Sequence, residues 1–341
     1  ALLRAMSAPP RVAFLTHGGP AIGLGHVVRC LSLARALAAA GASVGFFAGR
    51  DARVATMIDA GGFDVMEGNW EESLTATREL VAAHRPGMLV VDSYALTGAM
   101  LDTLRPLVGR LVAIDDIADR PLPAHTVING AAGAGNLDYR GGLPGTEYLL
   151  GPRYALLDPA YAEEPARHPR PSVERVLVTL GGGSHPATLG TVCRAVLTLD
   201  GVAVDVVAGP LTEPGEADEI ADARVVVHRG VSPLRPLMLA ADVAVSGAGM
   251  TLLELAATAT PTVYLMLAPN ESNSSVFERA GAALAAGSSH APDLGATVAL
   301  QLKRLAGDAA LRESLGSRAR RLVDGRGAQR VARALLAERE R

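Results

Sequence analysis

The sequence predicts an α/β protein made of two doubly wound domains that face each other across a cleft. Short apolar or β-branched runs alternate with longer helical patterns, the alternation pauses near the middle of the chain, and it then resumes. Such alternation is typical of parallel βαβ units. The 341 residues are 49% hydrophobic, which provides enough apolar material for two cores.

The first half of the chain contains four runs of strand length and three helical patterns. The predicted strands are residues 12–16, 44–48, 88–92 and 111–114, and the predicted helices are residues 27–40, 52–60 and 96–108. Because each helix follows a strand, consecutive strands are expected to lie parallel in one sheet. This half is therefore expected to form one Rossmann-like domain.

The second half repeats the pattern after a break. The predicted strands are residues 176–180, 204–208, 225–227, 243–246 and 262–267, and helices are predicted from the first of these strands to residue 199, at 236–241, at 251–259 and from the last strand to the end. The break, residues 154–171, is rich in Pro, Glu and Arg and lacks periodicity. These observations predict an N-terminal domain at 1–155, a linker at 156–171 and a C-terminal domain at 172–341, whose last helix is free to pack back on the N-terminal domain.

Charge and composition favour a small-molecule substrate. The 32 basic and 35 acidic residues are interspersed and give a net charge of −3, so we expect no nucleic-acid partner and no attraction to an anionic membrane. The apolar stretch at 246–267 is interrupted by Glu254 and Pro261, which predicts a buried helix and strand and no membrane insertion. The oligomeric state stays open.

A cytoplasmic location is expected. Residues 1–10 lack an apolar run of signal-peptide length. Cys30 and Cys193 lie far apart in apolar helical patterns, as is typical of reduced, buried thiols.

The first strand is followed by a glycine-rich turn that ends in Gly23-Leu24-Gly25-His26. Its glycines allow the backbone to approach a ligand where a helix begins. In the first turn, the positive end of the helix dipole disfavours a charged imidazole, so His26 is expected to be neutral and able to act as a general base. The alternative is a histidine that only caps the helix. The turn is not a dinucleotide fingerprint, because G-x-G-x-x-G and an acidic end to the second strand are both missing.

Acidic residues follow two further strands of the first half. The segment Asp92-Ser93-Tyr94 ends one strand and Asp115-Asp116 ends the next. Because the carboxyl ends of parallel strands meet at one edge, these side chains are expected to bind ligand hydroxyl groups or to orient His26. The alternative for Asp115 and Asp116 is helix capping. No metal site is expected, since no further ligands accompany them at suitable spacing.

Two glycine-rich loops in the second half predict a diphosphate site. The segment from Ser246 to Thr251 joins a strand to a helix and presents backbone N–H groups at the helix N-terminus. Glu254 is expected to reach a ribose diol, and the alternative is a capping box with Thr251. Gly181-Gly182-Gly183-Ser184 forms the second such loop.

Taken together, these segments resemble the GT-B-fold UDP-sugar hydrolases of pseudaminic-acid biosynthesis (the UDP-2,4-diacetamido-2,4,6-trideoxy-β-L-altropyranose hydrolase family), which are related to the peptidoglycan N-acetylglucosaminyltransferase. The matching segments are residues 22–30, 92–94, 114–120, Asn129, 150–157, Gly181-Gly182, 246–254 and Asn270.

The resemblance implies GT-B architecture and cleavage of the anomeric C–O bond of a UDP-sugar with inversion, without a metal or other cofactor. It implies that His26 activates water, with Tyr94 and Asp92 as the other catalytic residues. The substrate contacts that it implies are Gly25, Arg29, Asp115, Asp116, Asn129, Tyr154, Asn270 and Glu271. The nucleotide contacts that it implies are Gly182, Gly183, Val231 at the uracil, Gly247, Ala248, Gly249, Met250, Thr251 and Glu254.

Three positions depart from the family pattern. Thr16-His17-Gly18 stands where the family shows Arg-x-Asp, His185 replaces an aspartate, and Glu271 replaces a glutamine. These positions lie near the expected sugar and phosphate sites, so they leave the sugar open.

Three functional hypotheses follow. The favoured one is a hydrolase that transfers the sugar to water. The second is a glycosyltransferase with the same fold and base, which uses a small-molecule acceptor. The third is a nucleotide-sugar-binding protein without turnover, against which His26 and Tyr94 argue.

Overall fold

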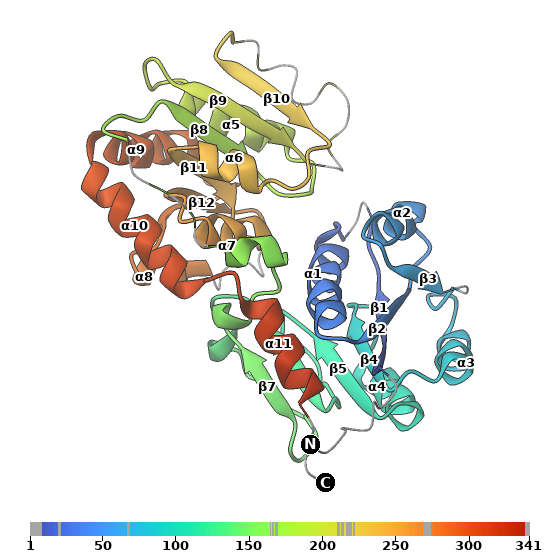
Figure 1. Cartoon of the computed structure of the whole chain (residues 1–341). Helices are drawn as coiled ribbons and strands as arrows, with labels where there is room; N and C mark the ends of the chain where they lie inside the picture. Colours follow the sequence, from blue (N-terminus) through green and yellow to red (C-terminus); the bar gives the residue numbers. More distant parts are fainter. Residues whose placement is uncertain are drawn as a thin grey trace, which may run out of the picture. The chain divides into compact units, whose positions relative to one another are not determined.

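The computed structural model describes residues 9–19, 22–66, 69–163, 165, 167, 170–209, 212, 215, 220, 222–268 and 274–337. The chain forms two compact units (Figure 1). Unit 1 comprises Ala1–Gly130, Asn136–Leu150 and Ala328–Arg341, and unit 2 comprises Ala131–Gly135 and Gly151–Gly327. The segment 156–171, expected as a linker, is part of unit 2. The final helix α11 (Gly327–Leu336) falls mostly within unit 1, where Arg110 donates a hydrogen bond of 2.7 Å to the carbonyl of Leu335.

Unit 1 contains a parallel sheet of seven described strands in the order β3-β2-β1-β4-β5-β6-β7. The strands are β1 (Arg11–Thr16), β2 (Ser43–Phe47), β3 (Asp64–Met66), β4 (Met88–Asp92), β5 (Arg110–Ile114), β6 (Thr126–Asn129) and β7 (Glu147–Leu150). The helices between them are α1 (Gly25–Ala39), α2 (Ala52–Ala60), α3 (Leu74–His84) and α4 (Gly98–Leu104). The four strands expected from apolar runs are confirmed.

Strands β3, β6 and β7 and helix α3 of unit 1 were not expected from the sequence. Strand β3 has only three residues and is largely exposed, and β6 and β7 have four residues each, so their local patterns are too short to stand out. The helix predicted at 96–108 was too long. Helix α4 ends at Leu104 and a short 3₁₀ turn at Arg105–Leu107 follows, because Pro106 lacks the N–H that an α-helix requires.

Unit 2 contains a parallel sheet of six described strands in the order β10-β9-β8-β11-β12-β13. The strands are β8 (Arg175–Thr179), β9 (Ala203–Ala208), β10 (Val225–Arg229), β11 (Val243–Gly247), β12 (Thr262–Met266) and β13 (Leu284–Ser288). The helices are α5 (Pro186–Val196), α6 (Arg235–Ala240), α7 (Met250–Ala257), α8 (Ser275–Arg279), α9 (Leu294–Gly307) and α10 (Ala309–Leu322). The expectation of helices alone after β12 was wrong, because the Ala- and Gly-rich segment β13 pairs with β12.

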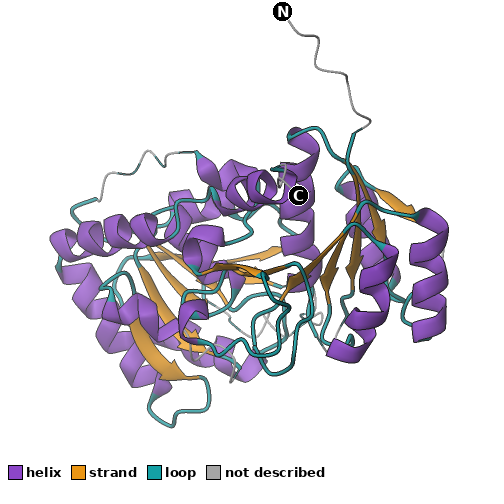
Figure 2. Ribbon diagram, turned by 90° about the horizontal axis from the view of Figure 1, so that it is seen from below, coloured by secondary structure: helices purple, strands orange, loops and turns teal. Residues whose placement is uncertain are grey.

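Both faces of the unit 2 sheet are covered. Successive residues of β8 belong to different cores, since Val176 and Val178 pack in one cluster and Leu177 packs in the other. Side chains alternate across a strand, so this division places apolar cores on both faces of the sheet. Figure 2 shows helices on both sides of the strands. The prediction of doubly wound α/β sheets is therefore confirmed.

Each sheet reverses its strand order once. In unit 1, β1 lies between β2 and β4, and Thr16 pairs with Asp92 at the carboxyl ends. In unit 2, β8 lies between β9 and β11, and Thr179 pairs with Ser246. Ligands of open parallel sheets bind beyond the carboxyl ends of strands at such reversals. Each unit therefore offers one position for a ligand.

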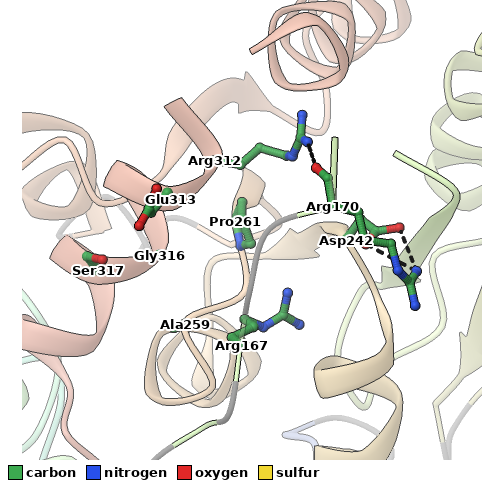
Figure 3. A pocket seen from close by; sticks show the side chains of 9 residues that line it. All are labelled: Arg167, Arg170, Asp242, Ala259, Pro261, Arg312, Glu313, Gly316 and Ser317. Carbon is green, nitrogen blue, oxygen red and sulfur yellow. Dashed lines mark hydrogen bonds and ion pairs between the residues drawn. The ribbon is translucent and has the colours of Figure 1, made fainter. Parts of the chain in front are cut away.

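Arginine side chains fix the segment that enters β8. Arg312 of α10 is 1% exposed and donates hydrogen bonds to the carbonyls of Arg170 and Pro171 (Figure 3). Arg167 donates to the carbonyls of Ala241 (2.8 Å) and Thr258 (3.2 Å). The side chains of Arg167, Arg170 and Arg312 line a pocket of about 100 Å³. In it, Arg167 and Arg312 donate to backbone carbonyls, whereas Arg170 pairs with the carboxylate of Asp242 at 3.2 Å. These arginines therefore serve the fold of unit 2.

Replacing Arg312 with methionine is expected to lower the free energy of unfolding by about 3 kcal/mol, because several buried carbonyls lose their donor. Urea denaturation would measure this change. Arg321→Met, an exposed position on the same helix, is the matched control and should change stability by less than about 0.5 kcal/mol. Equal stabilities of the two variants would contradict the proposed role of Arg312.

Candidate active site

The loop after β1 places His26 in the first turn of α1. The backbones of Gly19 and Gly23 exchange two hydrogen bonds, of 3.0 and 2.8 Å. Gly23 has φ of +77°, a conformation that favours glycine. Leu24 is the N-cap residue, and no side chain caps the helix. The alternative of a capping histidine is therefore not what the structure shows.

His26 and Asp92 form a buried hydrogen-bonded pair. The distance between His26 Nδ1 and Asp92 Oδ1 is 2.6 Å, and the two residues are 5% and 0% exposed. Burial raises the pKa of Asp92, but the charges and hydrogen bonds of Arg29 and His26 lower it further, to well below its usual range. Asp92 is thus a carboxylate that accepts the proton of Nδ1. The other ring nitrogen, Nε2, is then the one with a free lone pair.

Arg29 holds this carboxylate from the next turn of the same helix. Its Nε and Nη2 atoms donate to the two oxygens of Asp92, each at 2.6 Å, in a bidentate pair. Its Nη1 donates to Asp116 at 2.9 Å. Burial lowers the pKa of Arg29, but the two carboxylates raise it well above its usual value, so the guanidinium stays charged. His26 and Arg29 are three residues apart, which places both on the face of α1 toward β4.

Tyr94 completes the cluster. Its hydroxyl donates to Asp116 Oδ1 at 2.6 Å, and its ring lies edge-on to that of His26 with centroids 4.6 Å apart. Burial and the neighbouring Asp116 raise the pKa of Tyr94, so the phenol keeps its proton. The structure thus brings together His26, Arg29, Asp92, Tyr94 and Asp116, all predicted as site residues, within unit 1.

Asp115 and Asn129 form a separate arrangement nearby. Asp115 Oδ2 accepts from the backbone N–H groups of Ile117 and Ala118 and from the hydroxyl of Tyr139, which in turn accepts from Asn129. Asp115 therefore shapes the loop after β5. Asp115 thus accepts hydrogen bonds from backbone N–H groups, as the helix-capping alternative predicted, but the segment that it stabilises is a loop and not a helix. Burial raises the pKa of Asp115.

In unit 2, the predicted diphosphate loop lies at the start of α7. Gly249 is the N-cap residue and no side chain caps the helix, so the alternative of a capping box with Thr251 is not what the structure shows. A Cβ atom on Gly247 would come within 2.6 Å of the tip of the Leu267 side chain, which would have to move to admit a larger residue. Ala248 is buried, and Met250 and Thr251 open the helix. Backbone N–H groups of this turn are available to an anion.

The remaining predicted residues are spread over both units. Gly182 and Gly183 follow β8, which is one of the two strands at the strand-order reversal of unit 2; the α7 turn follows the other strand, β11. Val231 follows β10 and is 37% exposed. Tyr154 ends a 3₁₀ turn in unit 2, with the guanidinium of Arg153 5.2 Å from its ring centroid, whereas Gly25 is exposed at the start of α1. Asn270 and Glu271 lie outside the described residues.

Glu254 lies close to Tyr161, which the sequence did not indicate. The Tyr161 hydroxyl itself donates to Met238 Sδ at 3.8 Å. Burial raises the pKa of Glu254 to about 7, and the neighbouring Tyr161 hydroxyl lowers it only in part. Glu254 therefore takes up a proton close to neutral pH.

This pKa predicts a pH-dependent contribution to stability. Between pH 4.5 and about 7 the folded protein holds a proton on Glu254 that the unfolded chain has released, so stability falls as the pH rises. Wild type should lose stability relative to Glu254→Gln by about 1 kcal/mol per pH unit in this window. Urea denaturation of both proteins from pH 5 to 8 measures the difference. A constant difference across this range would contradict the prediction.

The sequence did not identify His17 as a site residue, although it directly follows β1. His17 is 6% exposed, and its ring centroid lies 5.1 Å from that of His26. Two signals were available: His17 lies beyond the carboxyl end of a strand at the strand-order reversal, and the segment Thr16-His17-Gly18 departs from the family pattern.

No group of three or more His, Cys, Asp or Glu residues is arranged to hold a metal ion in the described part of the chain. No described helix combines the length and apolar character that crossing a membrane requires.

No protein-family model matches this chain. Among curated proteins it is similar to the uncharacterized protein MJ1062 of Methanocaldococcus jannaschii, with 24% identity over 276 residues. The match covers 75% of this chain and 55% of MJ1062, so the chain spans about half the length of this relative.

Several solved structures are similar over nearly the whole chain. MurG of Acinetobacter baumannii has a TM-score of 0.66 at 15% identity and covers 95% of this chain and 99% of its own. A UDP-glucosyltransferase from Polygonum tinctorium has a TM-score of 0.67 at 15% identity, with 97% and 100% covered. A putative UDP-N-acetylglucosamine 2-epimerase from Listeria monocytogenes has a TM-score of 0.64 at 12% identity, with 96% of each covered. These likenesses confirm the GT-B fold and concern the fold alone.

Proposed function

We propose that this chain is a nucleotide-sugar enzyme that cleaves the anomeric C–O bond of a UDP-sugar with inversion, with water as the favoured nucleophile. The observation that carries the proposal is the buried His26–Asp92 pair at the carboxyl ends of β1 and β4. A histidine whose Nδ1 is held by a carboxylate presents Nε2 as a general base.

In the proposed reaction, His26 Nε2 removes a proton from water as the water oxygen attacks the anomeric carbon. The bond from that carbon to the diphosphate oxygen breaks, and its electron pair leaves with UDP. Asp92 stabilises the positive charge that the imidazole gains, and solvent later takes up the proton. Arg29 fixes Asp92 through two hydrogen bonds of 2.6 Å, which limits the movement of the pair.

We assign the nucleotide to unit 2. The turn before α7 offers backbone N–H groups and the positive end of a helix dipole, which stabilise the charge that develops on departing UDP. Glu254 is proposed to accept hydrogen bonds from the ribose. The glycines after β8 support the assignment, because they flank the same strand reversal as the α7 turn.

The second candidate is a glycosyltransferase that uses the same base and a small-molecule hydroxyl or amine acceptor. It is favoured by the similar structures that are named as glycosyltransferases, among them the Polygonum tinctorium enzyme. Binding without turnover is disfavoured, because a buried base–carboxylate pair is not needed to hold a nucleotide sugar.

Incubation of the protein with a panel of UDP-sugars tests the proposal. Release of UDP and an equal amount of free sugar without an acceptor is expected for a hydrolase. Release only after an acceptor is added would favour the glycosyltransferase, and no release in either condition would overturn both. In ¹⁸O-labelled water the hydrolase should place the label in the sugar, whereas label in UDP would mean attack at phosphorus.

A further inference from the structure

His17 is a second buried imidazole at the proposed site, and the mechanism above does not use it. It follows β1 directly, and its ring centroid lies 5.1 Å from that of His26, 6.1 Å from that of Trp70 and 6.5 Å from that of Tyr94. The ring is thus surrounded by aromatic side chains at the end of the strand that leads into the catalytic loop.

The contact between Ser93 and His17 is compatible with two tautomers of the ring. Ser93 Oγ accepts from the backbone N–H of Ala95 at 3.0 Å and lies 3.2 Å from His17 Nδ1. A hydroxyl group can donate to Nδ1 or accept from it, and the tautomer in which Ser93 donates carries the ring proton on Nε2. Burial, followed by the charge of His26, lowers the pKa of His17, and Glu71 at 3.8 Å does not reverse this. In this tautomer the ring is neutral and Nε2–H is a donor.

This donor is buried without a hydrogen-bond partner among the described residues. The whole residue is only 6% exposed. Buried donors in folded proteins are nearly always paired, so an unpaired one requires an explanation. A ligand oxygen that takes up the bond when substrate arrives provides one.

The surroundings hold the ring in place. Trp70 packs beside it and donates from Nε1 to the carbonyl of Thr16 at 3.3 Å. On the other side of the chain, a Cβ atom on Gly18 would come within 3.0 Å of Leu24 and Val54, so the backbone next to His17 is tightly packed. Nδ1 is already engaged with Ser93. Rotation of the ring to pair Nε2 elsewhere would break that bond.

We propose that His17 Nε2–H donates a hydrogen bond to an oxygen of the sugar and thereby helps to select which sugar is bound. This inference rests on the proposed function. The sugar is a better acceptor than the nucleophile, because the nucleophile must keep its lone pair for the anomeric carbon, whereas sugar hydroxyl and acyl oxygens are free to accept. Both imidazoles would then contact one substrate, with His26 as the base and His17 as a binding residue.

The test compares His17→Phe with His17→Gln on the best UDP-sugar of the panel. Phenylalanine keeps the ring shape and removes the donor, whereas the glutamine amide nitrogen can reach the position of Nε2. His17→Phe is expected to lower kcat/KM by about 10- to 100-fold, mainly through KM, and His17→Gln should recover a large part of this. The affinity for UDP alone and the pH profile of kcat should stay unchanged, because neither depends on a sugar contact.

A structural role would give a different pattern. If Nε2–H only contacts water or packing, His17→Phe should keep wild-type kcat/KM with wild-type thermal stability, and this would overturn the inference alone. If His17→Phe alters the pH profile of kcat, His17 is acting as a base, which would also overturn it. Absence of turnover by the wild type would overturn the proposed function and this inference together. His290→Ala, an exposed histidine in unit 2, controls for histidine removal as such.

Discussion

Replacement of His26 by alanine is expected to lower kcat for UDP release by about 10³-fold, because the nucleophile loses the base that removes its proton. The same variant should bind UDP as the wild type does, since the proposed nucleotide contacts lie in unit 2. Steady-state release of UDP and calorimetric titration with UDP measure the two quantities. The drop in kcat with unchanged UDP affinity separates loss of the base from loss of binding.

The fold of His26→Ala must be intact for this result to be informative. Asp92 retains its two hydrogen bonds from Arg29 in the variant, so the buried carboxylate stays paired and the thermal midpoint should change little. Wild-type kcat in a folded His26→Ala protein would show that His26 is not the base. His290→Ala again serves as the control.

Asp92→Asn is expected to lower kcat by about 10³- to 10⁴-fold, as loss of the orienting carboxylate does in other histidine-based sites. The asparagine amide can donate to His26 Nδ1, which would move the ring proton to Nε2 and leave no lone pair for the nucleophile. The neutral amide also cannot stabilise the imidazolium that forms during the reaction.

The same substitution is expected to destabilise the protein, because Arg29 is buried and would lose its bidentate partner. Removal of one member of a buried ion pair costs about 3 to 5 kcal/mol, and the remaining contact with Asp116 reduces this. Urea denaturation measures the change, and rates are corrected for the folded fraction at the assay temperature.

Asp116→Asn is the matched comparison for Asp92→Asn. It weakens a contact of the same arginine but leaves the hydrogen bond between His26 and Asp92 intact. Its kcat should therefore fall by only about 10-fold. If Asp116→Asn and Asp92→Asn reduced kcat equally, the effect would come from Arg29 or Tyr94, which both donate to Asp116, and the assignment of Asp92 as the partner of the base would be wrong.

The sequence was most informative where a structural element depends on residues that lie close together along the chain. Runs such as 12–16 and 88–92 are buried on both faces of a parallel sheet, so their apolar character is continuous and recognisable. The turn at Gly23 requires a positive φ, and the segment around Gly249 lies between a strand and a helix. The position of His26 at the start of a helix follows from the same local features.

The weakest predictions concern strand β13 and the role of Asp115. Strand β13 is an Ala- and Gly-rich segment with little intrinsic strand preference, and it is extended because β12 offers it a parallel edge. Asp115 was predicted to face substrate, yet the structure uses one of its oxygens to shape the loop after β5. The strand depends on a segment that is distant in sequence, whereas the Asp115 turn is local and is not distinguished by its residues from a substrate contact.

The amino-acid sequence by itself determined the doubly wound α/β fold, the glycine loops and the candidate base, because periodicity and turn chemistry act within about ten residues. Only the tertiary structure decided which groups surround that base. Asp92 reaches His26 across 66 positions of sequence, because β1 and β4 are adjacent and in register. The unpaired nitrogen of His17 and the raised pKa of Glu254 likewise arise from burial, which is a property of the packed protein and not of any short segment.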